Sequence, residues 1–144
     1  MPKVSVSTTV LASPEETWAT ASDLSRFGEW LVLHEGWRGE LPETIDAGTE
    51  LTSVVAVKGL RNRIAWRVES YDPPHSLNIS GKGVGGTRVS LTLSVSPDGG
   101  SQSTVDIDAE ITGPTTIGPV GMLIGRALKG DMRRSVALLT DLLS

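Results

Sequence analysis

The chain of 144 residues has 38% hydrophobic and 21% charged residues, the composition of a globular domain, and it contains no cysteine and only two histidines. Disulfides, thiolate catalysis and cysteine-ligated zinc are therefore excluded, and neither a metal centre nor a cofactor is expected. The net charge of -4 argues against a general nucleic-acid binder, and no apolar run has the length of a signal peptide or a membrane span. These features predict a cytoplasmic protein without a membrane partner.

The N-terminal region predicts one strand followed by two short helices. Residues 3–11 alternate between apolar and polar side chains, as in a half-buried strand. Residues 13–16, Ser-Pro-Glu-Glu, form a capping box that opens a helix. Asp23 is placed to cap a second helix that runs to about Leu33, and glycines then end helical order.

Five further strands are predicted between residues 48 and 113, separated by glycine and proline turns. They cover residues 51–58, 61–71, 76–81, 87–95 and 104–111. The short links favour an antiparallel meander, because parallel strands need long crossover connections. Apolar and polar residues alternate along the strands, so one face of the sheet is expected to be dry and the other solvated.

One long amphipathic helix is predicted from about residue 117 or 119 to residue 143. Its apolar stripe consists of Val120, Ile124, Leu128, Met132, Val136, Leu139 and Leu143. We expect this stripe to cover the dry face of the sheet. Three glycines in the first half of the helix each cost up to about 1 kcal/mol relative to alanine, which indicates either close backbone packing or space left for a guest.

Two N-terminal motifs carry a resemblance to a known superfamily: ASPEETW at residues 12–18 and DLSRFGEW at residues 23–30. With the order of the elements, they make the sequence similar to the START-like (SRPBCC) superfamily, in particular its polyketide cyclase/dehydrase and lipid transport group. The resemblance implies one α+β domain over residues 1–144 with a helix-grip fold. In that fold a six-stranded antiparallel sheet curves around the long C-terminal helix, with two short helices between strands 1 and 2.

Other segments resemble a narrower, actinobacterial subgroup, the toxin components of type II toxin-antitoxin pairs. These segments are WLVLHEGWRG at 30–39, RNRI at 61–64, GPVGM at 118–122 and ALKGD at 127–131. This resemblance implies a toxin that acts through protein or RNA contacts, with a cognate antitoxin as its partner.

The superfamily resemblance implies a hydrophobic cavity between the sheet and the C-terminal helix, and the helix glycines support it. The predicted function is therefore the binding of a hydrophobic small molecule, either a lipid or a polyketide-like compound. Candidate wall residues are Val55, Val57, Trp66, Leu77, Ile79, Val89, Leu91, Ile107, Ile124, Leu128 and Met132. The alternative for each is a place in a closed core. Trp37, outside any periodic element, is a candidate to close the cavity mouth, to anchor a partner or only to pack.

Charge is unevenly distributed along the chain. Residues 1–50 hold three basic and nine acidic residues, a net charge of -6, whereas residues 58–88 hold six basic and two acidic residues, a net charge of +4. The candidate partner-binding residues of this basic face are Arg61, Arg63, Arg67 and Arg88. The alternative is that they only solvate the outer face of the sheet. RNA contacts are not favoured, because Tyr71 is the one stacking aromatic nearby.

A third alternative, a polyketide aromatase or cyclase, requires polar groups inside the cavity that polarise a carbonyl and transfer protons. His34 beside Glu35 is instead expected at the surface or at a cap, and Asp131 on the surface of the long helix. The sequence offers no nucleophile, metal set or acid/base pair, so no catalytic residue is predicted and an enzyme is not favoured.

Overall fold

The computed structural model describes residues 3–57, 60–114 and 118–143. Lys58, Gly59 and Ile117, assigned from the sequence to the basic segment, a turn and the start of the long helix, lie outside the described residues. The elements are β1 (Lys3–Val10), α1 (Pro14–Ala21), η1 (Leu24–Arg26), α2 (Phe27–Trp30), β2 (His34–Arg38), β3 (Glu50–Val57), β4 (Leu60–Asp72), β5 (Ser76–Lys82), η2 (Val84–Gly86), β6 (Arg88–Pro97), β7 (Ser103–Thr112) and α3 (Gly118–Leu142).

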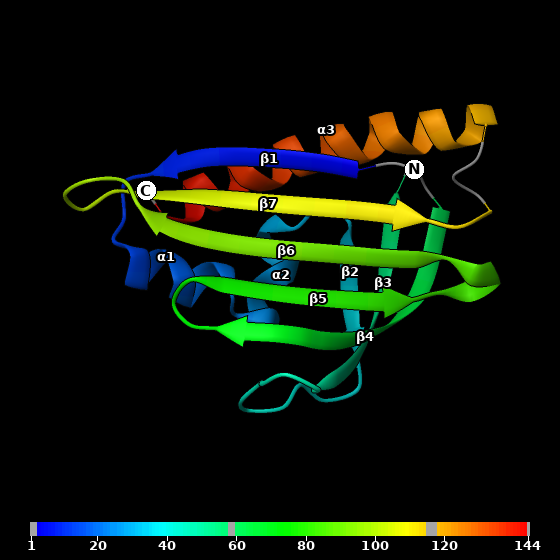
Figure 1. Ribbon diagram of the computed structural model, residues 1–144, viewed down its shortest axis with the longest axis horizontal. Coiled ribbons are helices and arrows are strands. Elements are labelled where there is room, and N and C mark those ends of the chain that lie inside the picture. Colours follow the sequence, from blue (N-terminus) through cyan, green and yellow to red (C-terminus); the bar gives the residue numbers. More distant parts are fainter. Residues whose placement is uncertain (1–2, 58–59, 115–117, 144) are drawn as a thin grey trace.

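The strands form one antiparallel sheet in the order β1-β7-β6-β5-β4-β3-β2. In Figure 1 the helices lie behind the strands, so that they cover the same face of the sheet. Helix α3 packs against β1 and α2. The predicted helix-grip architecture is confirmed. None of the helices in the described part of the chain is long and apolar enough to cross a membrane.

Two predicted N-terminal caps are present in the structure. The Glu16 N–H donates to Ser13 Oγ at 3.2 Å and so opens α1, and the Ser25 N–H donates to Asp23 Oδ1 at 3.0 Å. Ser135 of α3 fixes the helix to the segment after α2, because its Oγ accepts from the Val32 N–H at 2.9 Å.

The sheet has seven strands, one more than the sequence predicted. The second short helix ends at Trp30 rather than near Leu33, and the backbone becomes extended at Leu31, with φ -79° and ψ 98°. The chain then forms β2, which pairs with the free edge of β3. Five residues that include a glycine and a bulge carry no clear alternation, so the sheet edge and not the local pattern determines this strand.

Candidate functional site

A cavity of about 520 Å³ lies at one end of the sheet, where β3, β4, η2 and the first half of α3 meet. It is lined by Val55, Val57, Arg61, Asn62, Arg63, Ile64, Val84, Gly85, Thr87, Val89, Ile111 and Ile124. Its volume is within the range of about 300–1,000 Å³ that is usual for small-molecule sites. Because most of the lining is aliphatic, binding there would be driven mainly by burial of apolar surface.

The predicted wall residues divide into three groups in the structure. Val55, Val57, Val89 and Ile124 line the cavity. Trp66, Leu77, Ile79, Leu91 and Ile107 lie deeper, around two small voids of about 10 Å³ and about 20 Å³. Leu128 and Met132 are fully buried in the core beneath α3. All of these residues face inward. Whether such a residue lines a cavity or lies in a closed core depends on the distance between α3 and the sheet at that point.

One exposed apolar side chain lies at the rim of the cavity. Val84, in the η2 turn that lines it, is 76% exposed. Met122 and Leu123 on α3 are also exposed, at 64% and 48%, but in a helix the neighbours of the inward-facing Ile124 project away from it. Val84 therefore supplies the exposed apolar surface at the rim.

Two uncharged polar side chains also line the cavity, and neither was predicted from the sequence. Asn62 occupies an inward position of β4 in the series Asn62, Ile64, Trp66 and Val68, and Thr87 occupies the corresponding place ahead of Val89 on β6. A polar residue that interrupts an apolar face is the signal that would have identified them.

The inner void of about 10 Å³ is bordered by the aromatic cluster of Phe27, His34 and Trp37. The rings of His34 and Trp37 lie 4.7 Å apart, and those of His34 and Phe27 lie 6.0 Å apart. The expectation that His34 lies at the surface is wrong: the residue is 8% exposed, because it occupies an inward position of β2. Burial lowers the pKa of its imidazole.

Trp37 is part of this packing and is not a projecting anchor. Its side chain is half-buried on β2, and its indole N–H donates to the Leu24 carbonyl oxygen at 2.7 Å. Asp131 also differs from expectation: it is largely buried on α3, forms an ion pair with Arg134, and burial raises the pKa of its carboxyl. The position of Trp37 depends on a contact with Leu24, outside its own strand, and the burial of Asp131 depends on the docking of α3.

The buried imidazole of His34 makes stability dependent on pH. Its pKa in the folded protein lies below the ordinary value of 6.5, so the unfolded chain takes up the proton first. The free energy of unfolding is therefore expected to fall as the pH drops from about 7.5 to about 5.5, and less so in His34→Phe. Urea unfolding at both pH values tests this, with exposed His75→Gln as the control. Equal slopes in the wild type and His34→Phe would contradict it.

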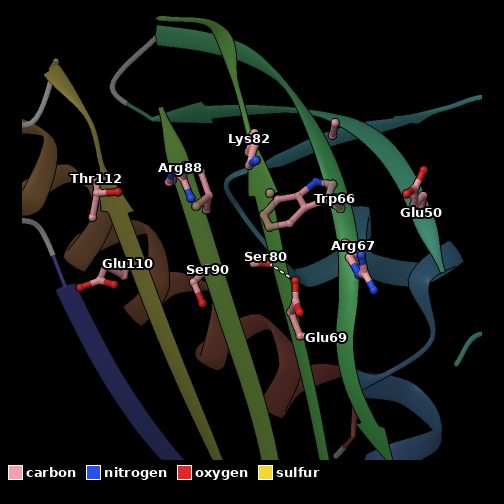
Figure 2. A pocket seen from close by; sticks show the side chains of 13 residues that line it. Glu50, Trp66, Arg67, Glu69, Ser80, Lys82, Arg88, Ser90, Glu110 and Thr112 are labelled. Atoms are coloured by element: carbon pink, nitrogen blue, oxygen red, sulfur yellow. Dashed lines mark hydrogen bonds between the residues drawn. The ribbon is translucent and has the colours of Figure 1, made fainter. Parts of the chain in front are cut away.

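A second hollow, of about 570 Å³, lies on the solvated face of the sheet. Figure 2 shows its charged side chains on neighbouring strands, and the Ser80 hydroxyl donates to Glu69 at 2.6 Å. The hollow is bordered by three cations and three carboxylates: Arg67, Lys82, Arg88, Glu50, Glu69 and Glu110. The basic face expected from residues 58–88 is thus of mixed charge, because β3 and β7 bring in acidic residues from outside that segment.

Of the four candidate partner-binding arginines, Arg67 and Arg88 line this hollow, whereas Arg61 and Arg63 lie at the rim of the cavity of about 520 Å³. Arg61 forms an ion pair with Glu35 of β2, with Nε to Oε2 at 2.9 Å. Among the described residues, no cluster of three His, Asp or Glu side chains is placed to hold a metal ion.

The curled antiparallel sheet, the long C-terminal helix and the cavity between them define a START-like protein. The fold is similar to that of a START superfamily protein from Mycobacterium smegmatis, with a TM-score of 0.75, 17% identity, and coverage of 98% of this chain and 96% of that one. It is also similar to the Zhui aromatase/cyclase from Streptomyces sp. R1128, with a TM-score of 0.77, 12% identity, and coverage of 98% and 92%. At these identities the likeness concerns the fold alone.

The chain belongs to the polyketide cyclase / dehydrase and lipid transport family, whose match covers residues 1–144. Among its relatives is the protein named Toxin Rv0910 of Mycobacterium tuberculosis, which is 44% identical over 136 residues and is matched over 94% of both chains. Both resemblances found in the sequence, to the superfamily and to the toxin subgroup, are therefore confirmed.

Proposed function

We propose that the protein binds a hydrophobic small molecule, a lipid or polyketide-like compound, in the cavity between the sheet and α3. The observation that carries this proposal is the cavity of about 520 Å³ with its aliphatic lining. Exposed Val84 at its rim gives such a ligand an apolar surface at the point of entry.

Two residues of one strand provide a matched test of this proposal. Val89 and Val95 are both buried on the inward face of β6, but only Val89 lines the cavity. Val89→Phe is expected to fill empty space, changing the free energy of unfolding by less than about 1 kcal/mol and abolishing ligand binding. Val95→Phe is expected to overpack the core and to cost about 1–3 kcal/mol.

Binding is measured by native mass spectrometry of protein purified from its own host and by calorimetric titration with dodecanoate. A co-purified small molecule that is absent from Val89→Phe supports the proposal. An empty protein that also fails to bind dodecanoate contradicts it, as does a Val89→Phe variant that binds as well as the wild type.

A second candidate function is that of a toxin, and the relative named Toxin Rv0910 favours it. Such a protein would act through contacts with a protein or RNA partner, and its cognate antitoxin would be a further partner. Arg67 and Arg88 supply the most direct test, because both line the hollow on the solvated face and neither has an ion-pair partner among the described residues.

Expression of the wild-type chain in its host is expected to arrest growth if the toxin function holds. The double charge reversal Arg67→Glu and Arg88→Glu would then restore growth without lowering the thermal midpoint of unfolding. Continued arrest by the charge-reversed variant would exclude the solvated face as the toxic surface. The variant Val89→Phe separates the two functions, because its side chain points into the cavity and the charged side chains of the solvated face are unchanged, although Val89 borders the hollow on that face too.

A further inference from the structure

We infer that the cavity recognises an amphiphile with a carboxylate or equivalent anionic head, held at the mouth by Asn62 and Thr87 while its apolar tail points inward. This inference rests on the proposed function, which it deepens by naming the ligand class and its orientation. It depends on the hydrogen-bonding state of the two side chains and on the charges around them.

The amide of Asn62 has a defined orientation. The Val84 N–H donates to Asn62 Oδ1 at 3.1 Å. A backbone N–H can only donate, so the amide atom that faces it must be the oxygen, and the free atom is Nδ2, which only donates. Gly83 maintains this arrangement, because a Cβ at that position would lie 2.7 Å from Asn62 Oδ1. The cavity therefore contains a positioned N–H donor.

Thr87 supplies a second donor from the neighbouring element. The residue is only 7% exposed and lines the cavity from the start of β6. Its hydroxyl has no hydrogen-bond partner among the described residues and is not enclosed by protein atoms, so it is open to a molecule in the cavity. A ligand acceptor at the mouth would satisfy both the Thr87 hydroxyl and the Asn62 amide.

The charge around these donors favours an anion. Arg61 and Arg63 flank Asn62 on β4 and also line the cavity, whereas no carboxylate does so among the described lining residues. Glu35 forms an ion pair with Arg61, so these two charges offset each other and Arg63 is the lining cation without an ion-pair partner among the described residues. Hydrogen bonds to a charged acceptor are about twice as strong as those between neutral groups, so an anionic head gains most from this arrangement.

The orientation follows from a comparison of the two ends of the interior. Beyond Val55, the two inner voids hold only about 10 Å³ and about 20 Å³, and most of their lining is apolar. One buried donor, Trp30 Nε1, lacks a partner at the inner end. A single N–H in so small a void accommodates an anionic head less well than two donors and one unpaired cation at the open end.

The test compares dodecanoate with methyl dodecanoate, which share a tail and differ in the charge of the head. We expect the wild type to bind the acid about 10- to 100-fold more tightly than the ester, as measured by displacement of a fluorescent apolar probe. Thr87→Val, which preserves shape, is expected to reduce this preference about 10-fold, because it removes a donor that a carboxylate accepts from more strongly than an ester does.

Asn62→Asp provides a sharper variant. It keeps an acceptor for the Val84 N–H and replaces the Nδ2 donor by a carboxylate oxygen, so the acid is expected to bind more weakly than the ester. Asn78→Asp is the matched control, because it makes the same change on β5, where the Asn78 side chain bonds Thr92 on the solvated face. This control is expected to retain the wild-type preference.

Three outcomes separate the inference from the proposed function. If neither acid nor ester binds, the proposed function fails and this inference fails with it. If both bind equally well in the wild type, the cavity binds apolar molecules and the anionic head site is wrong. If Trp30→Phe abolishes the preference while Thr87→Val retains it, the polar end lies at the inner void, and the orientation inferred here is overturned.

Discussion

Replacing Trp66 by alanine is expected to lower the free energy of unfolding by about 4 kcal/mol, the largest effect of any single substitution considered. The indole is 3% exposed on the inward face of β4, and its N–H donates to Ser53 Oγ at 2.6 Å. Alanine would leave a cavity of indole size and an unpartnered hydroxyl, because Ser53 is itself fully buried.

Guanidinium unfolding followed by circular dichroism measures this loss without relying on tryptophan fluorescence. Trp66→Phe removes the indole N–H together with part of the bicyclic ring but keeps one aromatic ring in the core, and we expect it to cost about 1–3 kcal/mol, less than Trp66→Ala. A loss below about 1 kcal/mol in Trp66→Ala would mean that the indole is not a structural wall of the interior.

Replacing Gly81 by alanine is the substitution with the second largest expected effect, a loss of about 1–3 kcal/mol. A Cβ on Gly81 would lie 2.3 Å from Ile64 Cγ2 and 3.0 Å from Trp66 Cε3, so both buried side chains would have to move. Because Gly81 of β5 has no side chain, the Trp66 indole can lie against the sheet at this position.

A double-mutant cycle tests this steric explanation. In an Ile64→Ala background the closest contact is removed, so Gly81→Ala is expected to cost less than it does in the wild type. Gly130→Ala is the control: a Cβ there would have no atom within 4 Å, and α3 should gain up to about 1 kcal/mol of stability. Equal costs for Gly81→Ala in both backgrounds would contradict overlap with Ile64.

The surroundings of Gly130 bear on the glycines of α3, which in the sequence suggested space for a ligand. The sequence allowed two explanations for them, close backbone packing or space for a ligand. At Gly130 the surroundings are open, so close packing does not explain the glycine. The cavity lies farther toward the N-terminus of α3, where Ile124 lines it.

Much of the fold was predictable because its signals are local. The capping residues Ser13 and Asp23, the alternation of β4 to β7 and the stripe of α3 each specify an element through neighbouring residues. β2 was missed because its hydrogen bonds come from β3, and its own sequence has no period. For the same reason the second helix was predicted too long: it ends at Trp30, and the chain then continues into β2.

The candidate site was predictable only in part. Val55, Val89 and Ile124 were selected because they are apolar and face inward, but the same reasoning selected Leu128 and Met132, which are closed core. The cavity donors Asn62 and Thr87 were missed because only apolar side chains were expected in the wall of an apolar cavity.

Sequence by itself determined the class of the protein: the order of elements, the two faces of the sheet, the family and the absence of cysteine chemistry. Tertiary structure decided where the interior is empty, which charges neutralise one another and which polar groups face inward, as with Arg61 beside Glu35 and Asn62 beside Val84. The physical reason is that periodicity records the face on which a residue lies, whereas a cavity depends on the separation of whole elements and on partners distant in the chain.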